Sequence, residues 1–398
     1  MKAMSQREVV VLGAARTPIG TYGGTLKDVP LTELATVAVK AALQRSGAAP
    51  DAIGHVVMGN VIPTEPRDAY LSRVAAIDSG IPETVPAFNV NRLCGSGLQA
   101  IVSAAQAIRL GDCDLAIGAG AESMTRGPYT VPNLRWGARM LDARLVDYMN
   151  GILHDPWKTV HMGVTAENVA ERYGITREMQ DELAAESQRR AAVAIVEGYF
   201  KEQIVPVDVK TKNGIVHFDT DEHVRSGVTV DALAAMKPIF RKEGGTVTAG
   251  NASGLNDGAG AVVLAEAGRA AALGLKPLAR LVGYAHAGVD PLYMGIGPVP
   301  ATRLVLERTG LKVDDLDVIE SNEAFAAQAC AVTRELGLDP RKVNPNGSGI
   351  SLGHPVGATG AIITTKAIYE LHRTGGRYAL VTMCIGGGQG IAAIFERL

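Results

Sequence analysis

The feature that most restricts the fold of this 398-residue chain is an internal repeat. Equivalent positions of its two halves, where strands, helices and glycines follow in one order, lie 262 or 263 residues apart. A near-constant offset over several elements indicates duplication. The alternative, that all α/β units look alike, explains a constant offset less well. The matched pairs are Asn60 with Asn322, Gly95 with Gly357, and Gly47 with Gly310.

Strands and helices alternate within both halves, which predicts an α/β fold with a mostly parallel sheet. The expected strands are 9–15, 55–60, 87–91, 115–120, 258–264, 317–322 and 379–382, and the expected helices include 31–45, 69–79, 165–173, 176–199 and 301–309. From residue 122 to 247 aromatic, methionine and charged residues increase. We interpret this stretch as a long insertion whose apolar surface needs cover.

Charge and cysteine content exclude several classes of protein. The net charge is −2, so no basic surplus points to nucleic acid. No apolar run approaches the ~20 residues of a membrane helix, and the apolar run 9–12 is too short for a signal peptide, so we expect a cytoplasmic protein without membrane contact. The four cysteines contain no C-x-x-C pair, so we expect free thiols and no metal site.

Cys94 lies where a predicted strand turns into an amphipathic helix that ends at Gly111. Unpaired N–H groups and a partial positive charge at a helix N-terminus lower the pKa of a thiol, and the thiolate is the nucleophile. Gly95 and Gly97 follow Cys94, so this is not the G-x-S-x-G elbow. For this segment alone, a buried cysteine followed by packing glycines remains an equal alternative.

Four glycine-containing turns would meet at the strand ends if the halves pair about a pseudo-dyad, since open α/β sheets build their sites there. Together they provide two thiols, an imidazole, a side-chain amide and free backbone N–H groups. Those are a nucleophile, a base and oxyanion donors, the parts of an acyl-transfer site. The turns are 94–97, 321–325, 353–357 and 384–388.

Five motifs then resemble the signatures of the thiolase family, in order and over essentially the whole chain. They are NRLCGSGLQA, TAGNASGLNDGAG, SNEAFAAQ, NPNGSGISLGHPVGATGA and MCIGGGQG. The resemblance is to bacterial β-ketothiolases, acetyl-CoA C-acyltransferases of the type that feeds polyhydroxyalkanoate synthesis. One departure is the segment 346–351, NGSGIS, where many members have GGAIA; it leaves only local packing or the shape of the acyl pocket in question.

The resemblance implies a thiolase-like duplicated fold of five layers, α-β-α-β-α, with an inserted loop domain. The N-terminal half would comprise 1–121 plus 249–275, the loop domain 122–248, and the C-terminal half 276–398. The loop domain would bind CoA and make oligomer contacts. The expected assembly is a homotetramer, a dimer of dimers.

The resemblance also implies catalytic roles that fit the chemistry above. Cys94 would carry the acyl group as a thioester, and His354 would take its proton. Cys384 would remove or return the proton alpha to the thioester carbonyl. Asn322 would hold a water that, with His354, binds the enolate oxygen, while the N–H groups of Cys94 and Gly386 would bind the tetrahedral oxyanion.

CoA enters as substrate and product, and no permanently bound cofactor is expected. Arg225 suits a phosphate, although a solvated surface arginine is the commoner case. Met162 and Met294 could line the acyl end, or could simply be core residues. The expected contacts with CoA or substrate are His161, Met162, Arg225, Phe240, Ala249, Gly250, Ser253, Met294 and Phe325.

The function that follows is reversible condensation of acetyl-CoA with acetyl-CoA or a short acyl-CoA, and thiolytic cleavage of the product. Alternatives are a degradative thiolase for longer chains, a carrier-protein condensing enzyme, a non-catalytic acyl-CoA-binding relative and a redox sensor. Condensing enzymes typically have a histidine or asparagine at the position of Cys384, and a sensor does not explain Asn322 or His354. Preferred chain length and physiological direction stay open.

Overall fold

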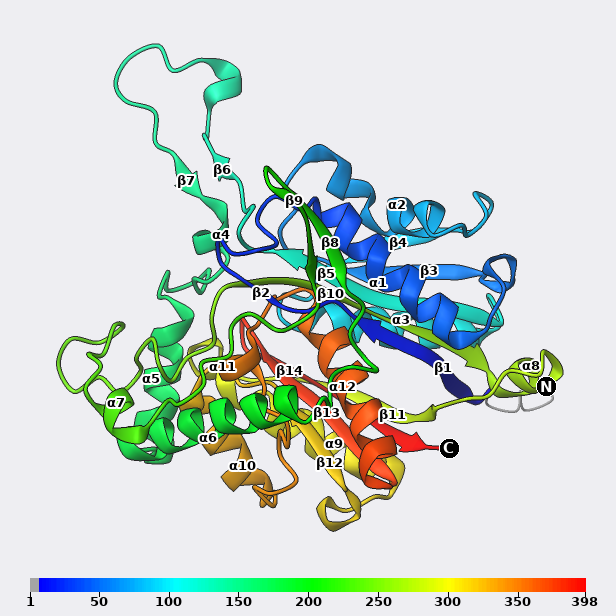
Figure 1. The fold of residues 1–398 in the computed structure, drawn as a ribbon. Coiled ribbons are helices and arrows are strands. Elements are labelled where there is room, and N and C mark those ends of the chain that lie inside the picture. Colours follow the sequence, from blue (N-terminus) through cyan, green and yellow to red (C-terminus); the bar gives the residue numbers. More distant parts are fainter. Residues whose placement is uncertain (1–6) are drawn as a thin grey trace.

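A computed structural model describes residues 7–398 of the chain. Ten of its strands form one mixed sheet in the order β12-β13-β14-β11-β1-β10-β5-β3-β4, with the short β2 paired to β10. The prediction of a mostly parallel sheet is wrong, because only β3–β4, β3–β5 and β12–β13 run parallel and the other neighbouring pairs are antiparallel. Antiparallel neighbours can be joined by a short turn, as β13 and β14 are, so the alternation of strands and helices does not fix every strand direction. Only two residue pairs, between β1 and β11, join the two halves of this sheet. The sheet therefore consists of two similar parts with a narrow connection (Figure 1).

The N-terminal part begins with a fully buried strand and ends with strand β10, which returns after the insertion to lie between β1 and β5. Its strands are β1 (Val9–Arg16), β2 (Gly20–Thr21), β3 (His55–Gly59), β4 (Ala87–Val90), β5 (Leu115–Ser123) and β10 (Asn256–Glu266). Its helices are α1 (Leu31–Ser46), α2 (Leu71–Asp78), α3 (Ser96–Leu110) and α8 (Ala267–Ala272).

The C-terminal part repeats this arrangement in β11 to β14. Its strands are β11 (Ala279–Gly288), β12 (Val318–Ser321), β13 (Tyr378–Ile385) and β14 (Gln389–Arg397). Its helices are α9 (Pro298–Thr309), α10 (Ala326–Leu336), α11 (Gly349–Leu352) and α12 (Thr359–Thr374).

The pairing registers confirm the duplication predicted from the sequence. In the parallel pair β3–β5, Val56 lies opposite Ile117, and in β12–β13, Val318 lies opposite Ala379, so that paired residues are 61 positions apart in both halves. β1 and β11 each carry an irregularity at the same place, before Gly13 and before Gly283. A register is set by side-chain burial, so these matches show that both halves bury their strands in the same way.

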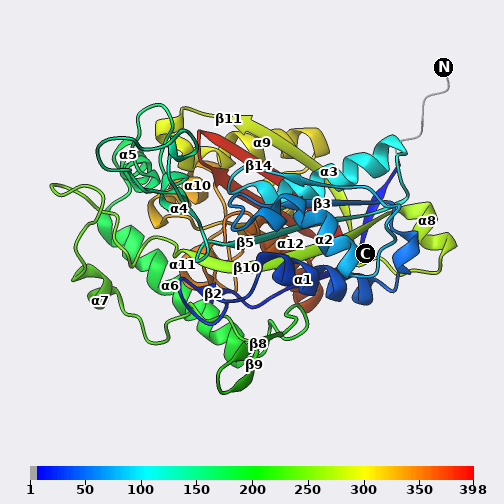
Figure 2. The same ribbon diagram turned by 90° about the horizontal axis from the view of Figure 1, so that it is seen from above.

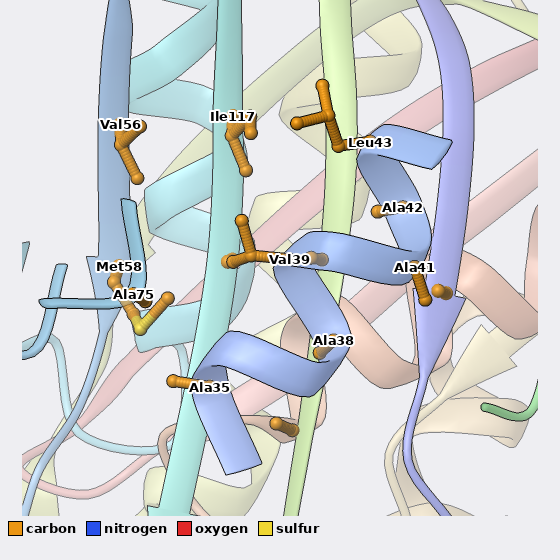
Figure 3. Close-up of a cluster of buried hydrophobic side chains, with 14 of the residues drawn as sticks. Ala35, Ala38, Val39, Ala41, Ala42, Leu43, Val56, Met58, Ala75 and Ile117 are labelled. Carbon is orange, nitrogen blue, oxygen red and sulfur yellow. The ribbon is translucent and has the colours of Figure 1, made fainter. Parts of the chain in front are cut away.

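Three hydrophobic clusters separate the molecule into five layers. One lies between α1 or α2 and the N-terminal strands, and Figure 3 shows Val39 of α1 against Ile117 of β5. A second joins α3 and α12 to strands of both parts, and a third lies between the C-terminal strands and the helices α9 and α10. Figures 1 and 2 show α3 and α12 between the two parts of the sheet. The predicted α-β-α-β-α order is confirmed.

The insertion between β5 and β10 contributes four α-helices and two hairpins. Its elements are β6 (Tyr129–Thr130), β7 (Val146–Asp147), α4 (Tyr148–Gly151), α5 (Met162–Tyr173), α6 (Arg177–Val196), β8 (Val207–Thr211), β9 (Gly214–Phe218) and α7 (Val230–Ala234). Thr176 caps α6, its side chain accepting the N–H of Met179. The arm between β6 and β7 stands clear of the body in Figure 1.

Candidate active site

One cavity of about 480 Å³ is lined by residues of both halves and of the insertion. It contains the three groups expected to react, the thiols of Cys94 and Cys384 and the imidazole of His354. Nine further residues expected at the site also lie on its wall: His161, Met162, Arg225, Phe240, Ala249, Ser253, Met294, Phe325 and Gly386. Residues more than 250 positions apart in the chain therefore meet in one place, as the pseudo-dyad predicts.

Cys94 lies on a constrained turn between β4 and α3. Leu93, the residue before it, has a φ of +46°, which side chains with a Cβ seldom adopt. The N–H of Leu93 donates to Asn91 Oδ1 at 2.9 Å, and Ser96 Oγ donates to the Leu93 carbonyl at 2.6 Å. Two side chains thus hold the strained Leu93 in place. Backbone strain of this kind is common at functional sites, and here it lies directly before Cys94.

The electrostatic expectation for Cys94 is wrong for the free protein. Burial raises the pKa of the Cys94 thiol, and the nearby carboxyl of Glu122 acts in the same direction. The N–H groups of Gly386 and of Cys94 itself oppose this increase and do not overcome it. Cys94 precedes the first residue of α3 by two positions, so it gains only part of the helix dipole while losing most of its hydration. The side chain of Cys94 is therefore a thiol in the free protein.

Cys384 lies at the end of β13, opposite Gly390 of β14, and is 1% exposed. Burial raises the pKa of its thiol well above the usual range, and the charge of an ionised Cys94 raises that pKa further. An ionised Cys94 can affect the pKa of Cys384 in this way only if the two sulfurs lie near each other. Gly387 and Gly388 then turn the chain with φ near +80°, and Gly386 directs its N–H toward the Cys94 sulfur.

His354 is buried, and burial lowers its pKa to about 4, so the ring is neutral at physiological pH. Its backbone N–H donates to Asn256 Oδ1 at 3.0 Å. Asn322 Nδ2 lies 3.3 Å from Nε2 and 3.5 Å from Nδ1 of the ring. Asn322 therefore contacts the His354 ring but does not itself line the main cavity.

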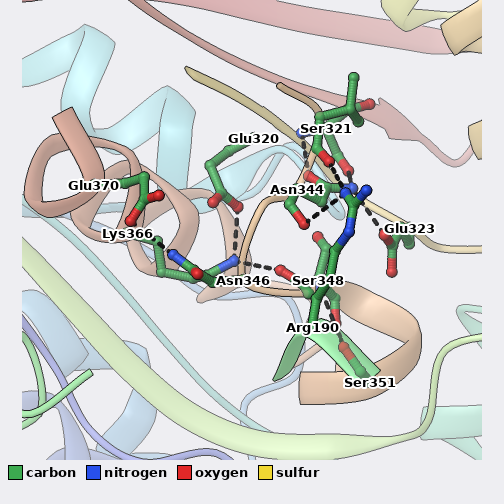
Figure 4. A network of polar contacts seen from close by, with 12 residues as sticks. Arg190, Glu320, Ser321, Glu323, Asn344, Asn346, Ser348, Ser351, Lys366 and Glu370 are labelled. Atoms are coloured by element: carbon green, nitrogen blue, oxygen red, sulfur yellow. Dashed lines mark hydrogen bonds and ion pairs between the residues drawn. The ribbon is translucent and has the colours of Figure 1, made fainter. Parts of the chain in front are cut away.

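A buried polar network supports the Asn322 turn (Figure 4). Asn344 brackets Ser321, accepting its N–H at 2.9 Å and donating to its carbonyl at 2.8 Å. Glu323 accepts from Asn344 at 2.8 Å and from Ser187 of α6 at 2.6 Å. Lys366 of α12 binds the Gly347 carbonyl at 2.6 Å. None of residues 346–351 lines the main cavity, so the departure from the family pattern affects this network and not the acyl pocket.

The two halves are also joined beside the nucleophile by Glu122, at the end of β5. Its carboxyl accepts the N–H groups of Val61, Ile62 and Gly357 at 3.1, 3.0 and 2.8 Å. Burial raises the pKa of Glu122 to about 8 in spite of these donors. Since Gly357 precedes α12, this single side chain fixes the start of a C-terminal helix against an N-terminal strand.

Three aromatic rings contact one another in the wall of the cavity. The rings of His161 and Phe240 stack at 4.7 Å, and Phe325 meets Phe240 edge-on at 6.2 Å. Burial lowers the pKa of His161 to about 4, so it presents a neutral surface. Gly250 is an exception among the expected contacts: it packs under Leu233 and Met236 and does not line the cavity.

Several residues of the cavity were not expected from the sequence. Most are apolar side chains of the segment before α5 or of the turns themselves, and nothing distinguishes them from core residues in the sequence. His223 is different, because it lies two positions before Arg225 and could have been noticed with it. The unexpected residues are Met124, Met149, Asn150, Leu153, His223, Ile239, Ala252, Gly254, Leu255, Ala324 and Val356.

Within residues 7–398, no group of His, Cys, Asp and Glu side chains is arranged to hold a metal ion. In the same part of the chain, none of the helices combines the length and the apolar character that a membrane crossing requires.

Comparison with known proteins agrees with this geometry. The family model of the thiolase N-terminal domain matches residues 9–268, and that of the thiolase C-terminal domain matches residues 275–397. The chain is 68% identical to the beta-ketothiolase BktB of Cupriavidus necator, over 98% of this chain and all of the relative. It is 49% identical to an acetyl-CoA acetyltransferase of Syntrophomonas wolfei, again over 98% of this chain and all of the relative.

Solved structures give the same result. The acetyl-CoA acetyltransferase of Bacillus anthracis superimposes with a TM-score of 0.97 at 47% identity, covering all of both chains. Human mitochondrial 3-ketoacyl-CoA thiolase in complex with CoA superimposes with a TM-score of 0.96 at 44% identity, covering 99% of this chain and 98% of that one. Matches to both domain models and to whole relatives, together with the shared fold, establish that the chain belongs to the thiolase family.

Proposed function

We propose that this protein is an acyl-CoA C-acyltransferase that reversibly condenses acetyl-CoA with acetyl-CoA or a short acyl-CoA to a 3-ketoacyl-CoA, and cleaves that product with CoA. The observation that carries the proposal is the meeting of two thiols and a neutral imidazole on one cavity wall. Covalent attachment and proton transfer alpha to a carbonyl are two separate tasks, and two thiols can divide them. The related beta-ketothiolase and acetyl-CoA acetyltransferase support the same reaction class.

In the first half-reaction, Cys94 Sγ attacks the thioester carbonyl while its proton passes to His354. Because the pKa of Cys94 is raised and that of His354 is lowered, the resting pair is thiol and imidazole. The proton therefore moves during the attack, as general-base catalysis requires. The N–H groups of Cys94 and Gly386 are proposed to bind the oxyanion, and the CoA thiolate leaves with the proton.

In the second half-reaction, the proton of Cys384 passes to the free Nε2 of His354, and the resulting thiolate removes a proton from the methyl group of acetyl-CoA. The carbanion then attacks the acyl group on Cys94 and releases the Cys94 sulfur, which takes the proton back from His354. Once acylated, Cys94 cannot ionise, so it cannot carry the charge that would oppose ionisation of Cys384. We propose that His354 and Asn322, the latter through a water, stabilise the enolate oxygen.

The test is a series of cleavage rates for 3-ketoacyl-CoA substrates of increasing chain length, with condensation of acetyl-CoA measured alongside. We expect the largest kcat/KM for short chains. Highest values for long chains would instead identify the degradative thiolase. Binding of acyl-CoA without either reaction would contradict the proposal and identify a non-catalytic relative.

For CoA, we propose contacts with Arg225 and with the His161–Phe240 stack, supported by their place on the cavity wall. CoA is a substrate and product in this proposal, not a resident cofactor. Arg225→Ala should raise the KM for CoA about tenfold with kcat little changed, as loss of a phosphate contact predicts. Lys212→Ala, on the exposed turn between β8 and β9, is the matched control. Equal KM values for CoA in the two variants would show that Arg225 does not bind CoA.

For assembly, we propose a homotetramer, a dimer of dimers. Apolar side chains on the arm from β6 to β7 support it, since Trp136, Met140 and Leu141 are 80%, 86% and 94% exposed. Light scattering at micromolar concentration should give a tetramer mass. The double variant Trp136→Ser with Leu141→Ser should give a smaller species. A monomer mass for the unaltered protein would refute the assembly.

The domain limits remain a proposal: 1–121 plus 249–275, 122–248, and 276–398. The position of β10 between β1 and β5 supports assigning 249–275 to the N-terminal half. We also propose a cytoplasmic location and supply of 3-ketoacyl-CoA to polyhydroxyalkanoate synthesis. Cell fractionation tests the first, and polymer content after deletion of the gene tests the second.

A further inference from the structure

The shortest polar contact of the His354 ring is with a threonine that the proposed reaction does not use. Thr359 Oγ1 lies 2.6 Å from Nδ1 of His354. The same oxygen lies 2.8 Å from the Pro355 carbonyl, one turn earlier. Thr359 is the first residue of α12 and is 1% exposed, so water does not compete for these contacts.

The directions of these two hydrogen bonds follow from the number of protons. A carbonyl only accepts, so the single hydroxyl proton of Thr359 points to Pro355 O. The hydroxyl can then only accept from His354 Nδ1, which must carry the ring proton. Because the pKa of His354 is about 4, the ring has one proton at neutral pH, and Nε2 therefore has none.

Asn322 makes only long contacts with the His354 ring. Its Nδ2 lies 3.3 Å from Nε2 and 3.5 Å from Nδ1, against 2.6 Å for the contact between Thr359 and Nδ1. Both Asn322 distances exceed the usual range of a hydrogen bond. A closer proton donor in the cavity can therefore take the Nε2 lone pair in place of Asn322.

We propose that Thr359 is a positioning residue for the acyl transfer: by accepting the Nδ1 proton it holds His354 in the tautomer whose Nε2 acts as the base. This rests on the proposed role of His354. In the step concerned, the S–H bond of Cys94 breaks as the proton binds to Nε2 and the sulfur bonds to the acyl carbon. The proton then leaves with the CoA sulfur, and Thr359 keeps its bond to Nδ1 throughout.

The first measurement is the single-turnover rate of acylation of Cys94 by acetyl-CoA in three variants. Thr359→Val removes the acceptor and keeps the shape, and we expect acylation to slow about 100-fold, the lower end of what a positioned base contributes. Thr359→Ser keeps the hydroxyl and should stay within about threefold of the unaltered enzyme. Thr364→Val is the matched control, since Thr364 is also buried in α12 and bonds only the carbonyl one turn earlier, at 2.7 Å.

The second measurement is the ¹⁵N shift of the His354 ring, assigned by comparison with His354→Asn, which needs no activity. We expect the Nδ1-protonated tautomer in the unaltered protein and in Thr359→Ser, and a mixture in Thr359→Val. An Nε2-protonated ring in the unaltered protein would overturn the proposal, and so would equal acylation rates for Thr359→Val and Thr364→Val. If Cys94 is never acylated, the proposed function fails, and the ring spectrum still decides the role of Thr359.

Discussion

The two turns that carry the thiols occupy related places in the duplicated fold but differ in exposure and strain. In the N-terminal half, Cys94 is half-buried and follows Leu93, which is held at φ +46°. In the C-terminal half, Cys384 is fully buried in the regular ladder of β13 and β14. His354 and Asn322, also from the C-terminal half, are buried as well.

This difference fits the proposed division of the reaction between the two halves. The group proposed to bond a large substrate, Cys94, is the more exposed one. The groups proposed to move protons, Cys384 and His354, lie in a dry environment that shifts their pKa. The packing of the two halves brings both environments to one cavity.

Of the measurements that test this difference between the two turns, the largest effect is expected at Cys94. Cys94→Ala should lower turnover by roughly 10⁴-fold or more, because no other group can hold the acyl chain. Acetyl label should reside on Cys94 in the unaltered enzyme, as measured by digestion and mass spectrometry. Label found mainly on Cys113, Cys330 or Cys384 would mean that the exposed turn is not the covalent site.

A smaller and more selective effect is expected at Cys384. Cys384→Ser should form the acyl-enzyme within a few-fold of the normal rate, while condensation falls by about 10²- to 10⁴-fold, as loss of a general base predicts. Rapid quench separates the two steps. If both steps fall equally, Cys384 supports the structure and the division between the halves is not real.

The buried base should also leave a signature in stability. The folded-state pKa of His354 is about 4 against 6.5 for a free ring, so the unfolded chain binds a proton first as the pH falls. Stability is therefore lost from about pH 6.5 downward, and this one ring accounts for about 2 kcal/mol between pH 7.5 and pH 5.

Between pH 7.5 and pH 5, the His354→Asn variant should lose about 2 kcal/mol less stability than the unaltered protein. Urea unfolding at each pH measures this difference. The other rings with a lowered pKa, His161, His223 and His286, are present in both proteins and cancel in the difference. An identical loss in variant and parent would show that His354 is not held neutral by burial.

The smallest effect concerns oxidation of the two thiols. Both pKa values are raised, so mild peroxide should link Cys94 to Cys384 slowly at neutral pH. The rate should increase about tenfold per pH unit while the thiolate is the minor form. Acetyl-CoA should protect, because an acylated Cys94 has no free sulfur. Peptide mapping that finds no cross-link, or no protection, would mean the sulfurs cannot reach each other.

Local patterns in the sequence were sufficient for much of the fold. The strand before Cys94, the helix after it and the ends of α1 and α9 at Gly47 and Gly310 all lie within a residue or two of their predicted positions. The alternation of buried strands with amphipathic helices is a pattern among residues near one another in the sequence. It could therefore be predicted without knowing which segments pack together in space. The repeat offset predicted which turns would meet, and twelve of the fourteen expected site residues line the cavity.

The tertiary structure alone decided the electrostatics and the supporting contacts. The helix N-terminus after Cys94 predicted a lowered pKa for its thiol, but burial of the thiol reverses the direction. Thr359 looked like an ordinary helix residue until its hydroxyl was found against His354.

What the sequence determined by itself is the set of reactive groups and the order of elements that presents them, because both are properties of neighbouring residues. What it could not determine is how charged and how accessible these groups are. Burial and hydrogen bonding at Cys94, Cys384 and His354 come from segments hundreds of positions away, and their effects vary with distances of a few ångströms. Those distances exist only once the two halves have packed together.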